Sequence, residues 1–420
     1  MLVYVINKNG HPLMPCKPAK ARKLLRDKKA KVIRRTPFTI KLLWDCEEHV
    51  QDLTLGVNSG SKVVGTAVRD DKNQVYYLSE VILRQDISLK LDKRRMYRRS
   101  RRSRKTRYRK PRWSNRKNSI KFDKYPPTIR SKYNSLIKEM KFVSKILPIK
   151  YLIIETGTFD VHALHNPAVI KHPWLYQKGL QFGYYNTKQF VLSRDGYTCQ
   201  YCKGKSKDSH LQVHHIIYKS QGGTDRPDNL ITLCKTCHHN LHIGQIQLNK
   251  RHFKNIKLGL KHATHMNILQ SIIRKRLAGY YTETYGYITK AIREYFKIPK
   301  AHCYDAVCVE ITNSVKPTLL TDRIILKKCI NKGRYQQTWG KHSEYKHLDK
   351  KIHGFKIRDK VLYQNIICFI KGCIPQNRYC YYKLCDIFGK IIKFKPMAKS
   401  NTMQRLSARK SWIMTEYKLF

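Results

Sequence analysis

The alternation of apolar and polar residues is clearest between residues 52 and 86. Three apolar runs, LTLGVN, VVGTAVRD and QVYYLSEVIL, are separated by turn-forming residues, and this pattern predicts three strands joined as a meander. Residues 1–51 begin with an alternating strand, VYVI, and a turn, NKNGHPLMP. A helix with apolar spacing at Ala21, Leu24 and Leu25 and further strands in KVIRRTPFTIKLLW follow. We therefore expect a small basic module of strands with one helix before the meander.

Helical spacing dominates the middle of the chain. Residues 128–147 place apolar side chains three and four positions apart, which predicts an amphipathic helix; these are Leu136, Ile137, Met140, Val143, Ile146 and Leu147. A short strand, KYLIIETGTFD, follows Pro148, and a second helix is predicted over residues 259–278. From about residue 351 the pattern changes to the short runs KIRDKVLY, IICFIKGCI, YCYYKLCDIF and KIIKFKP. These runs predict a small C-terminal β-barrel or half-barrel.

The charge of the chain changes the picture most. Among its 420 residues, Lys and Arg total 86 against 28 Asp and Glu, a formal net charge of +58. Such self-repulsion is tolerable when a polyanion neutralises it, so nucleic acid is the expected partner. A membrane surface is the competing interpretation, but no apolar run approaches the ~18 residues of a membrane span, and no basic amphipathic helix or anchor is evident. We therefore expect no membrane association.

The N-terminus and the cysteine usage point to a reducing compartment. MLVYVINKNGHPLMP is typical of a strand and a turn rather than of a signal peptide. The 13 cysteines are an odd number, which argues against a full disulfide framework. Enrichment in Lys, Ile, Tyr and Asn hints at an AT-rich genome. The cytoplasm or nucleoid of a bacterium, or the stroma of an organelle, is the expected location, and secretion is not expected.

The most concentrated charge lies in 93-KRRMYRRSRRSRKTRYRKPR-112, where 13 of 20 residues are Lys or Arg and none is acidic. Free in solution this segment would repel itself and fray, whereas on a phosphate backbone it can be a helix with cations on every face. A disordered tail or a localisation signal is the alternative, but the segment lies between two apolar regions. The residues expected to bind nucleic acid are Arg94, Arg95, Arg98, Arg99, Arg101, Arg102, Arg104, Lys105, Arg107 and Arg109.

Two cysteine pairs form the most specific motif. Cys199 and Cys202 are separated by two residues, as are Cys234 and Cys237. Four thiolates at this spacing predict a closed tetrahedral zinc site, which clamps a module too small to fold on its own core. Chance placement and two disulfides are the alternatives. The x4 spacing of Cys368, Cys373, Cys380 and Cys385 fits buried core thiols better than a second metal site, and Cys303 and Cys308 are expected to pack on a helix.

Between and after these pairs, His215, Asn229 and His238 stand in the order His, Asn, His, within VHHII, DNL and CHH. This arrangement resembles the HNH nuclease motif, whose fold is a ββα-metal finger. The resemblance implies that His215 is the general base, that Asn229 pins the loop carrying it, and that His214 and His238 ligate a catalytic Mg²⁺ or Mn²⁺. Many members of that family have Asp in place of His214, and a His there can favour borderline metals.

Other histidines of this block, His210, His239 and His242, are expected to face solvent or at most to contact phosphate. A zinc finger that only binds nucleic acid is the simpler alternative for the whole block. The additional order of two adjacent histidines, an asparagine and a further histidine argues against it, because a simple finger does not need these residues.

Three separated segments resemble the RuvC-type RNase H fold. They are LGVNSGSK with Asn58, YLIIETG with Glu155, and AHCYDAVCV with His302 and Asp305 three positions apart. Sites of this kind gather acidic residues around two cations about 4 Å apart. The family has Asp at the position of Asn58, and an amide is a poorer ligand for a hard cation. Three interpretations of Asn58 remain open: the site is inactive in the natural protein, it is weakly active through Glu155, Asp305 and His302, or an introduced substitution blocks it. We expect an inactive or severely weakened site.

The order of these features resembles IscB, a family of transposon-associated, RNA-guided DNA nucleases. The N-terminal GHPLMPCKPAKARKLLRDKKAKVIRRTPFTIKL is similar to the family's PLMP domain, residues 93–112 to its bridge helix, and the C-terminal strands, by position and pattern, to its domain that reads a target-adjacent motif. The implied fold class is multidomain α/β, an RNase H-like split RuvC domain with an inserted HNH module. The implied division is 1–51 PLMP, 52–87 RuvC I, 88–115 bridge helix, 116–180 RuvC II, 181–250 HNH, 251–325 RuvC III and 326–420 C-terminal domain.

By this resemblance the chain is a monomeric ribonucleoprotein that binds a structured guide RNA and double-stranded target DNA and nicks the guide-paired strand with its HNH module. Two other classes remain open from the sequence. A homing-type HNH endonuclease would find DNA without RNA, and a non-catalytic RNA-binding zinc protein would show no metal-dependent scission.

Overall fold

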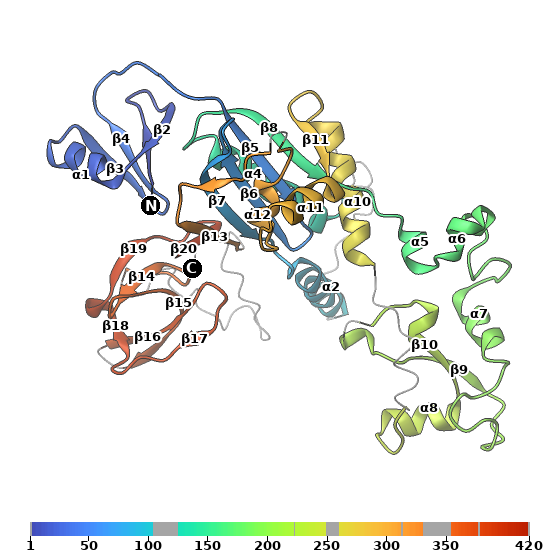
Figure 1. Cartoon of the computed structure of the whole chain (residues 1–420). Coiled ribbons are helices and arrows are strands. Elements are labelled where there is room, and N and C mark those ends of the chain that lie inside the picture. The colour runs from blue at the N-terminus through green and yellow to red at the C-terminus, as the bar shows by residue number, and fades with distance from the viewer. Residues whose placement is uncertain are drawn as a thin grey trace. The chain divides into compact units, whose positions relative to one another are not determined.

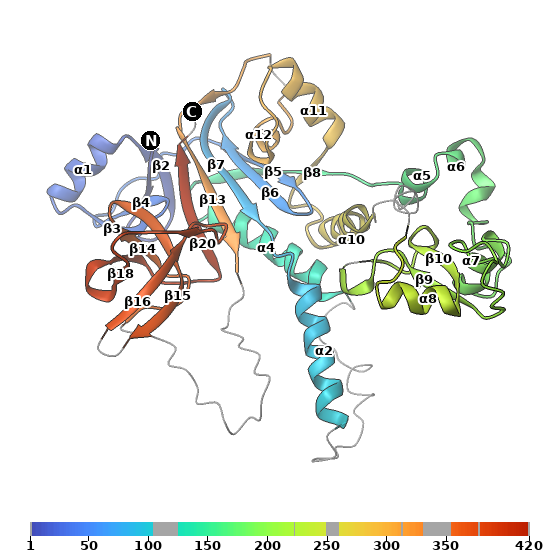
Figure 2. The same ribbon diagram turned by 90° about the horizontal axis from the view of Figure 1, so that it is seen from below.

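The computed structural model describes residues 2–103, 125–221, 223–248, 260–311, 314–330, 354–376 and 379–418. It divides into two compact units, residues 1–157 with 266–420 and residues 158–265, and each is described by itself. Figures 1 and 2 label the elements. Within the described residues, no helix combines the length and apolar character that crossing a bilayer requires.

The first unit is built on a mixed sheet of eight strands. Its order is β11-β8-β5-β6-β7-β13-β20, with β12 paired to β7. The meander predicted over residues 52–86 is confirmed, because β5, β6 and β7 pair antiparallel in sequence. The bounds are β5 Leu53–Ser59, β6 Val63–Arg69, β7 Gln74–Ile82, β8 Ile149–Thr156, β11 Thr282–Tyr285, β12 Thr318–Leu319, β13 Arg323–Cys329 and β20 Trp412–Lys418.

Helices cover both faces of this sheet. Apolar side chains of α4 and α10 pack with Leu55, Val57 and Val64, whereas α12 packs on the opposite face against Ala67 and Leu78 (Figure 2). The approach of α12 requires a glycine on β6, since a Cβ on Gly65 would lie 1.9 Å from the carbonyl oxygen of His302. The helices of this region are α2 Ile87–Ser103, α4 Pro127–Val143, α10 Lys261–Arg276, α11 Gly286–Tyr295 and α12 His302–Val307.

The N-terminal module is a separate four-stranded sheet, in the order β2-β1-β4-β3, with its own small core. Its bounds are β1 Val3–Ile6, β2 Pro12–Cys16, α1 Pro18–Arg26, β3 Ala30–Arg35 and β4 Phe38–Leu42. The sequence PLMPC, expected to belong to a turn, is strand β2 and pairs with β1. Two prolines suit this position because β2 is an edge strand, and the backbone groups along its outer edge need no partner in a neighbouring strand.

The C-terminal strands form a six-stranded sheet, ordered β17-β16-β15-β14-β19 with β18 paired to β16. Its strands are β14 Lys360–Tyr363, β15 Ile366–Gln376, β16 Tyr379–Cys385, β17 Ile391–Ile392, β18 Ala398–Lys399 and β19 Gln404–Ser407. The domain division at 325/326 needs correction, because it cuts β13, which pairs with β7, while β20 returns to pair with β13. The buried Lys327, 2.6 Å from Glu139 Oε1, further ties β13 to α4.

The second unit surrounds a two-stranded antiparallel ribbon of β9 and β10. It extends beyond the expected 181–250 module at both ends. Its elements are α5 Val161–His165, α6 Ala168–Lys171, α7 Thr187–Arg194, β9 Leu211–His215, β10 Leu230–Cys234 and α8 Lys235–His242, with short 3-10 turns at Pro173–Tyr176, Lys219–Gln221 and Pro227–Asn229.

Candidate nuclease and metal sites

The four cysteines Cys199, Cys202, Cys234 and Cys237 converge in the second unit. Their sulfur atoms all lie within 4.8 Å of one another, and all are free thiols in the structure. Cys234 also caps helix α8, because its sulfur accepts a hydrogen bond from the backbone N–H of Cys237 at 3.4 Å. Four soft donors at this mutual distance fit a structural zinc ion, which agrees with the spacing of the sequence motif.

Three imidazoles gather on the face of the ribbon that carries α8. The ring of His214 on β9 lies 5.0 Å from that of His238 and 5.1 Å from that of His242. The three offer donor atoms within 4.8 Å of one another. His242 is exposed, as expected, but it also offers a third donor atom to the cluster, which was not expected. His238 and His242 are four residues apart on one helix, so they share a face, and this spacing could have predicted the third donor.

This cluster fits a divalent cation. Burial and the neighbouring imidazoles lower the pKa of His214 to about 4, so its nitrogens remain available as neutral donors near pH 7. Its Nε2 is buried and, among the described residues, lacks a hydrogen-bond partner. A buried nitrogen without a partner is costly, and a cation held by His214, His238 and His242 would remove that cost. Imidazole donors suit transition metals such as zinc, iron and nickel better than Mg²⁺.

His215 follows His214 on β9, so its side chain leaves the opposite face of the ribbon. Its Nε2 lies 2.8 Å from Oδ1 of Asp225, which is also paired with Lys219 Nζ at 2.7 Å. Hydrogen bonds from Lys219 and His215 lower the pKa of Asp225, so the carboxylate stays ionised. Asp225 therefore fixes Nε2 as the protonated nitrogen of His215 and leaves Nδ1 as the acceptor. Asp225 was not among the residues predicted from the sequence.

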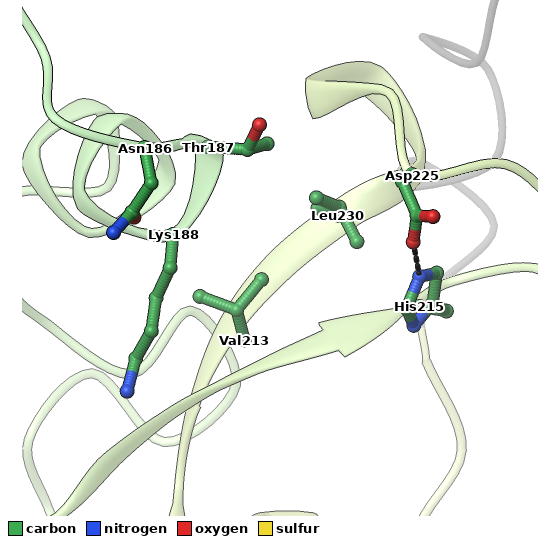
Figure 3. A pocket seen from close by; sticks show the side chains of 7 residues that line it. All are labelled: Asn186, Thr187, Lys188, Val213, His215, Asp225 and Leu230. Carbon is green, nitrogen blue, oxygen red and sulfur yellow. Dashed lines mark hydrogen bonds and ion pairs between the residues drawn. The ribbon is translucent and has the colours of Figure 1, made fainter. Parts of the chain in front are cut away.

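A shallow cavity of about 370 Å³ opens beside His215. Figure 3 shows Val213 and Leu230 between His215 on one side and Lys188 of α7 on the other. The cavity therefore combines apolar side chains, an ammonium group and the imidazole of His215.

Asn229 pins the loop that follows His215. Its Oδ1 accepts from the backbone N–H of Ile217 at 2.9 Å, and its Nδ2 donates to the carbonyls of Ile217 at 3.0 Å and Thr224 at 2.8 Å. The side chain is 1% exposed. Gly223 belongs to the same loop, where a Cβ would lie 1.8 Å from the Ile217 carbonyl oxygen. Backbone contacts thus hold His215 in place.

The second candidate site lies on the central sheet of the first unit. Asn58 of β5 and Glu155 of β8 are register partners on parallel strands. Asn58 Nδ2 donates to Glu155 Oε2 at 2.9 Å, and Asn58 Oδ1 lies 2.8 Å from Nδ1 of His302 on α12. The structure therefore brings together three side chains from segments more than 90 residues apart in sequence.

Asp305, the fourth residue expected here, is engaged elsewhere. Its Oδ1 lies 3.0 Å from Nε of Arg293 on α11. Burial is the main cause that raises the pKa of Glu155. In the described residues these groups do not form a cluster of metal donors. The polar atoms of Asn58, Glu155 and His302 instead satisfy one another.

The basic segment begins as helix α2, Ile87–Ser103. Arg94, Arg95, Arg98 and Arg99 are exposed on it, and Arg101 and Arg102 continue the helix. Arg104, Lys105, Arg107 and Arg109 lie outside the described residues. The exposed arginines form a cationic helix surface suited to a phosphate backbone.

The remaining cysteines pack as expected. Cys303 and Cys308 are fully buried, as are Cys368 and Cys385. Cys368 and Cys380 belong to the core of the C-terminal sheet, with Cys373 packed against it. None of these thiols belongs to a metal-donor cluster in the part of the chain that the structure describes.

Comparison with known proteins agrees with the second unit's geometry. Residues 199–243 match the HNH endonuclease family, and residues 3–179 match a family described as RRXRR protein. A type IV methyl-directed restriction enzyme, EcoKMcrA of Escherichia coli strain K12, is 37% identical over 65 residues, which are 14% of this chain and 23% of that enzyme. Anaredoxin of Nostoc sp. strain PCC 7120 is 32% identical over 63 residues, 15% of this chain and 80% of that protein.

Solved structures of Streptococcus thermophilus Cas9 also resemble the chain. The complex with the AGAA PAM has a TM-score of 0.34 at 11% identity, and the complex with the AGGA PAM has a TM-score of 0.30 at 10% identity. Both cover 62% of this chain, and the chain spans 32% of each Cas9 chain. Residues 199–243, which carry the pinned His215 and the zinc-type cysteine cluster, are therefore an HNH endonuclease domain.

Proposed function

We propose that this protein is an RNA-guided DNA endonuclease whose HNH module nicks the DNA strand paired to the guide. The observation that carries the proposal is the ribbon of β9 and β10. Strand β9 ends at His215, which is held by Asp225 and directly follows His214 of the three-imidazole cluster with His238 and His242, so the base and the cluster lie at the same end of the ribbon.

The residues divide the reaction between them. A cation bound by the three imidazoles would supply charge neutralisation at the scissile phosphate and its leaving oxygen. His215 takes the proton of the attacking water at Nδ1, while Asp225 stabilises the imidazolium through Nε2. Asn229 keeps the loop after His215 from moving, and the cysteine cluster, with zinc, holds β10 and α8 together.

Guidance by RNA rests on the distribution of charge. The net charge of +58 exceeds what a short duplex footprint needs, and α2 presents arginines that can follow the backbone of an RNA–DNA heteroduplex without reading bases. In this proposal residues 1–51 are a PLMP domain, the central sheet is a RuvC-like domain, and the C-terminal sheet reads a short motif on duplex DNA. The protein acts as a monomeric ribonucleoprotein.

The central sheet is proposed to be impaired as a nuclease. Asn58 donates to Glu155 and accepts from His302, an arrangement that needs no cation, so the displaced strand would remain intact. The expected product is a nick in the guide-paired strand.

The test is to purify the full chain from its host, sequence any bound RNA, and supply duplexes complementary to that RNA with Mg²⁺ or Mn²⁺. A strand-specific nick is expected, and His215→Ala should lower its rate by at least the ~10²–10⁴-fold of general-base catalysis. His239→Ala changes an exposed histidine on helix α8 and should leave the rate unchanged. Persistent nicking by the His215 variant would contradict the assignment.

A protein-only endonuclease is the second candidate. It is favoured by the 37% identity to EcoKMcrA, which is described as a restriction enzyme. Ribonuclease treatment separates the two, because a protein-only enzyme retains its cleavage when RNA is destroyed. A non-catalytic zinc protein would cleave in neither case.

A further inference from the structure

Two tyrosines stand exposed at the junction of β11 and α11. The exposed fractions of Tyr285 and Tyr287 are 44% and 73%. Their rings are nearly parallel, with 6.0 Å between centroids and 11° between planes. The pair therefore presents aromatic faces to solvent instead of contributing them to a core.

The backbone fixes this pair beside the central-sheet site. Tyr285 is the register partner of Thr156, the residue after Glu155 on the neighbouring parallel strand. Gly286 lies between the two tyrosines, and a Cβ there would be 3.1 Å from Oε1 of Glu155. The same helix supplies Thr289, which hydrogen-bonds Glu155. A chain passing Glu155 therefore also passes the two rings.

The charges around the pair suit a polyanion. Lys290 is exposed three residues after Tyr287 on α11, where its Nζ lies 3.9 Å from Glu294 Oε1, and Lys297 and Lys300 are exposed beyond the end of that helix. Aromatic faces next to cations are the combination that binds single-stranded nucleic acid, since rings stack on bases while cations follow the phosphates. A duplex cannot use such rings in the same way, because its base faces are already stacked.

We infer that Tyr285 and Tyr287 form a stacking platform for unpaired bases of a single DNA strand that runs past Glu155. The inference deepens the proposed function, on which it rests for the source of that strand: pairing of a guide with one DNA strand releases the other. The platform holds the released strand whether or not the adjacent site cleaves it.

The experiment uses the full chain and a single-stranded DNA oligonucleotide carrying 5-iododeoxyuridine, which cross-links to stacked aromatic rings on irradiation. Mass spectrometry is expected to locate the cross-link on Tyr285 or Tyr287. Replacing both residues by Ala should weaken binding of single strands by about tenfold, within the range of base–aromatic stacking, with duplex binding changed less than about twofold. Replacing both by Phe should keep the affinity, because the rings remain.

Tyr295→Ala provides the matched control, since Tyr295 is 71% exposed at the other end of the same helix; its affinity should equal that of the wild type. Cross-links at other residues, or single-strand binding by the double Ala variant equal to that of the wild type, would overturn the platform. The edge strand β11 would then be assigned to binding a protein partner. Nicking of the guide-paired strand is measured on the same preparations. A protein that nicks without a cross-link at the pair keeps the proposed function and lacks the platform, and one that cross-links without nicking has only the platform.

Discussion

The two candidate sites differ in whether their polar atoms have hydrogen-bond partners. On the β9–β10 ribbon, the donor atoms of three imidazoles point at one another, and the buried Nε2 of His214 has no partner in the described residues. On the central sheet, the amide of Asn58 joins Glu155 to His302, so each polar atom of that contact is satisfied. A cation would satisfy the buried donor that the first site leaves without a partner, whereas the contact of the second site leaves no such atom.

The difference follows from one functional group. An amide is both a donor and an acceptor, so Asn58 can bridge a carboxyl and an imidazole without an ion. A carboxylate at the same position would face Glu155 with a second negative charge, and only a cation or a proton could relieve the repulsion. A metal site is thus recognised by what its residues leave unsatisfied as much as by their identity.

The largest effect is expected from removing the zinc ligands. Cys234→Ser should abolish zinc binding and unfold residues 158–265, because metal binding of ~10–16 kcal/mol is available to fold such small modules. Limited proteolysis should then cut this unit while the first unit resists. Cys373→Ser, in the C-terminal sheet, is the control that should retain zinc; equal protection of both variants would show that the cysteines do not hold the module together.

Asn58→Asp tests the comparison directly. Without divalent cations the variant should lose about 1–3 kcal/mol in free energy of unfolding, because two buried carboxyls then compete. With Mg²⁺ or Mn²⁺ it should regain stability and cut the displaced strand at least ~10²-fold faster than the wild type. Asn58→Ala removes the amide without adding charge and should gain no cleavage. If divalent cations change neither the stability nor the cleavage rate of the Asp variant, Asn58 is not the cause of the difference between the two sites.

His242→Ala measures the third donor of the ribbon site. Loss of one ligand should raise the Mn²⁺ concentration needed for half-maximal nicking by about 10–100-fold, with less effect on the rate at saturating metal. Metal titration of the cleavage rate gives the comparison, with His239→Ala as the neighbour that should titrate like the wild type. An unchanged Mn²⁺ concentration for half-maximal nicking would show that His242 is not a metal ligand.

The smallest effect is expected for the exposed arginines of α2, which would bind nucleic acid for both sites. Arg98→Ala should weaken nucleic-acid binding uniformly across sequences and lower the slope of log affinity against log salt by about one. Fluorescence anisotropy at several salt concentrations measures this slope. Lys8→Ala changes a lysine already paired with Asp45 and should leave it unchanged.

Local pattern predicted most elements, because their signals lie in consecutive residues. The meander of β5–β7 and helix α4 are examples, as are the thiolate pairs and the Asn229 loop. Pairing between distant strands carries no such signal. β13 and β20 were therefore missed as members of the central sheet, and the boundary at 325/326 was placed inside β13. β2 was missed because two prolines indicate a turn unless the strand is known to lie at an edge.

In the candidate sites, too, local sequence signals could be predicted and long-range contacts could not. Residue identity and order pointed to His214, His215, Asn229 and His238. Asp225 and the contact of Asp305 with Arg293 depend on which side chains meet across loops and helices, so they could not be predicted. The exposure of His242 was expected and its part in the histidine cluster was not, although its spacing from His238 is visible in the sequence.

The pairing of β13 with β20 gives the C-terminal sheet an unusual topological status. Cys329 and Trp412 are opposite one another on antiparallel neighbours, so everything from residue 330 to 411 is formally the connection of a hairpin. Replacing that span with a tight turn would keep the pairing of β13 with β20, but it would expose Leu326 and Ile413, which pack against Phe369, Cys385 and Ile387. A different recognition domain inserted at this one pair of positions would therefore have to cover the same apolar surface.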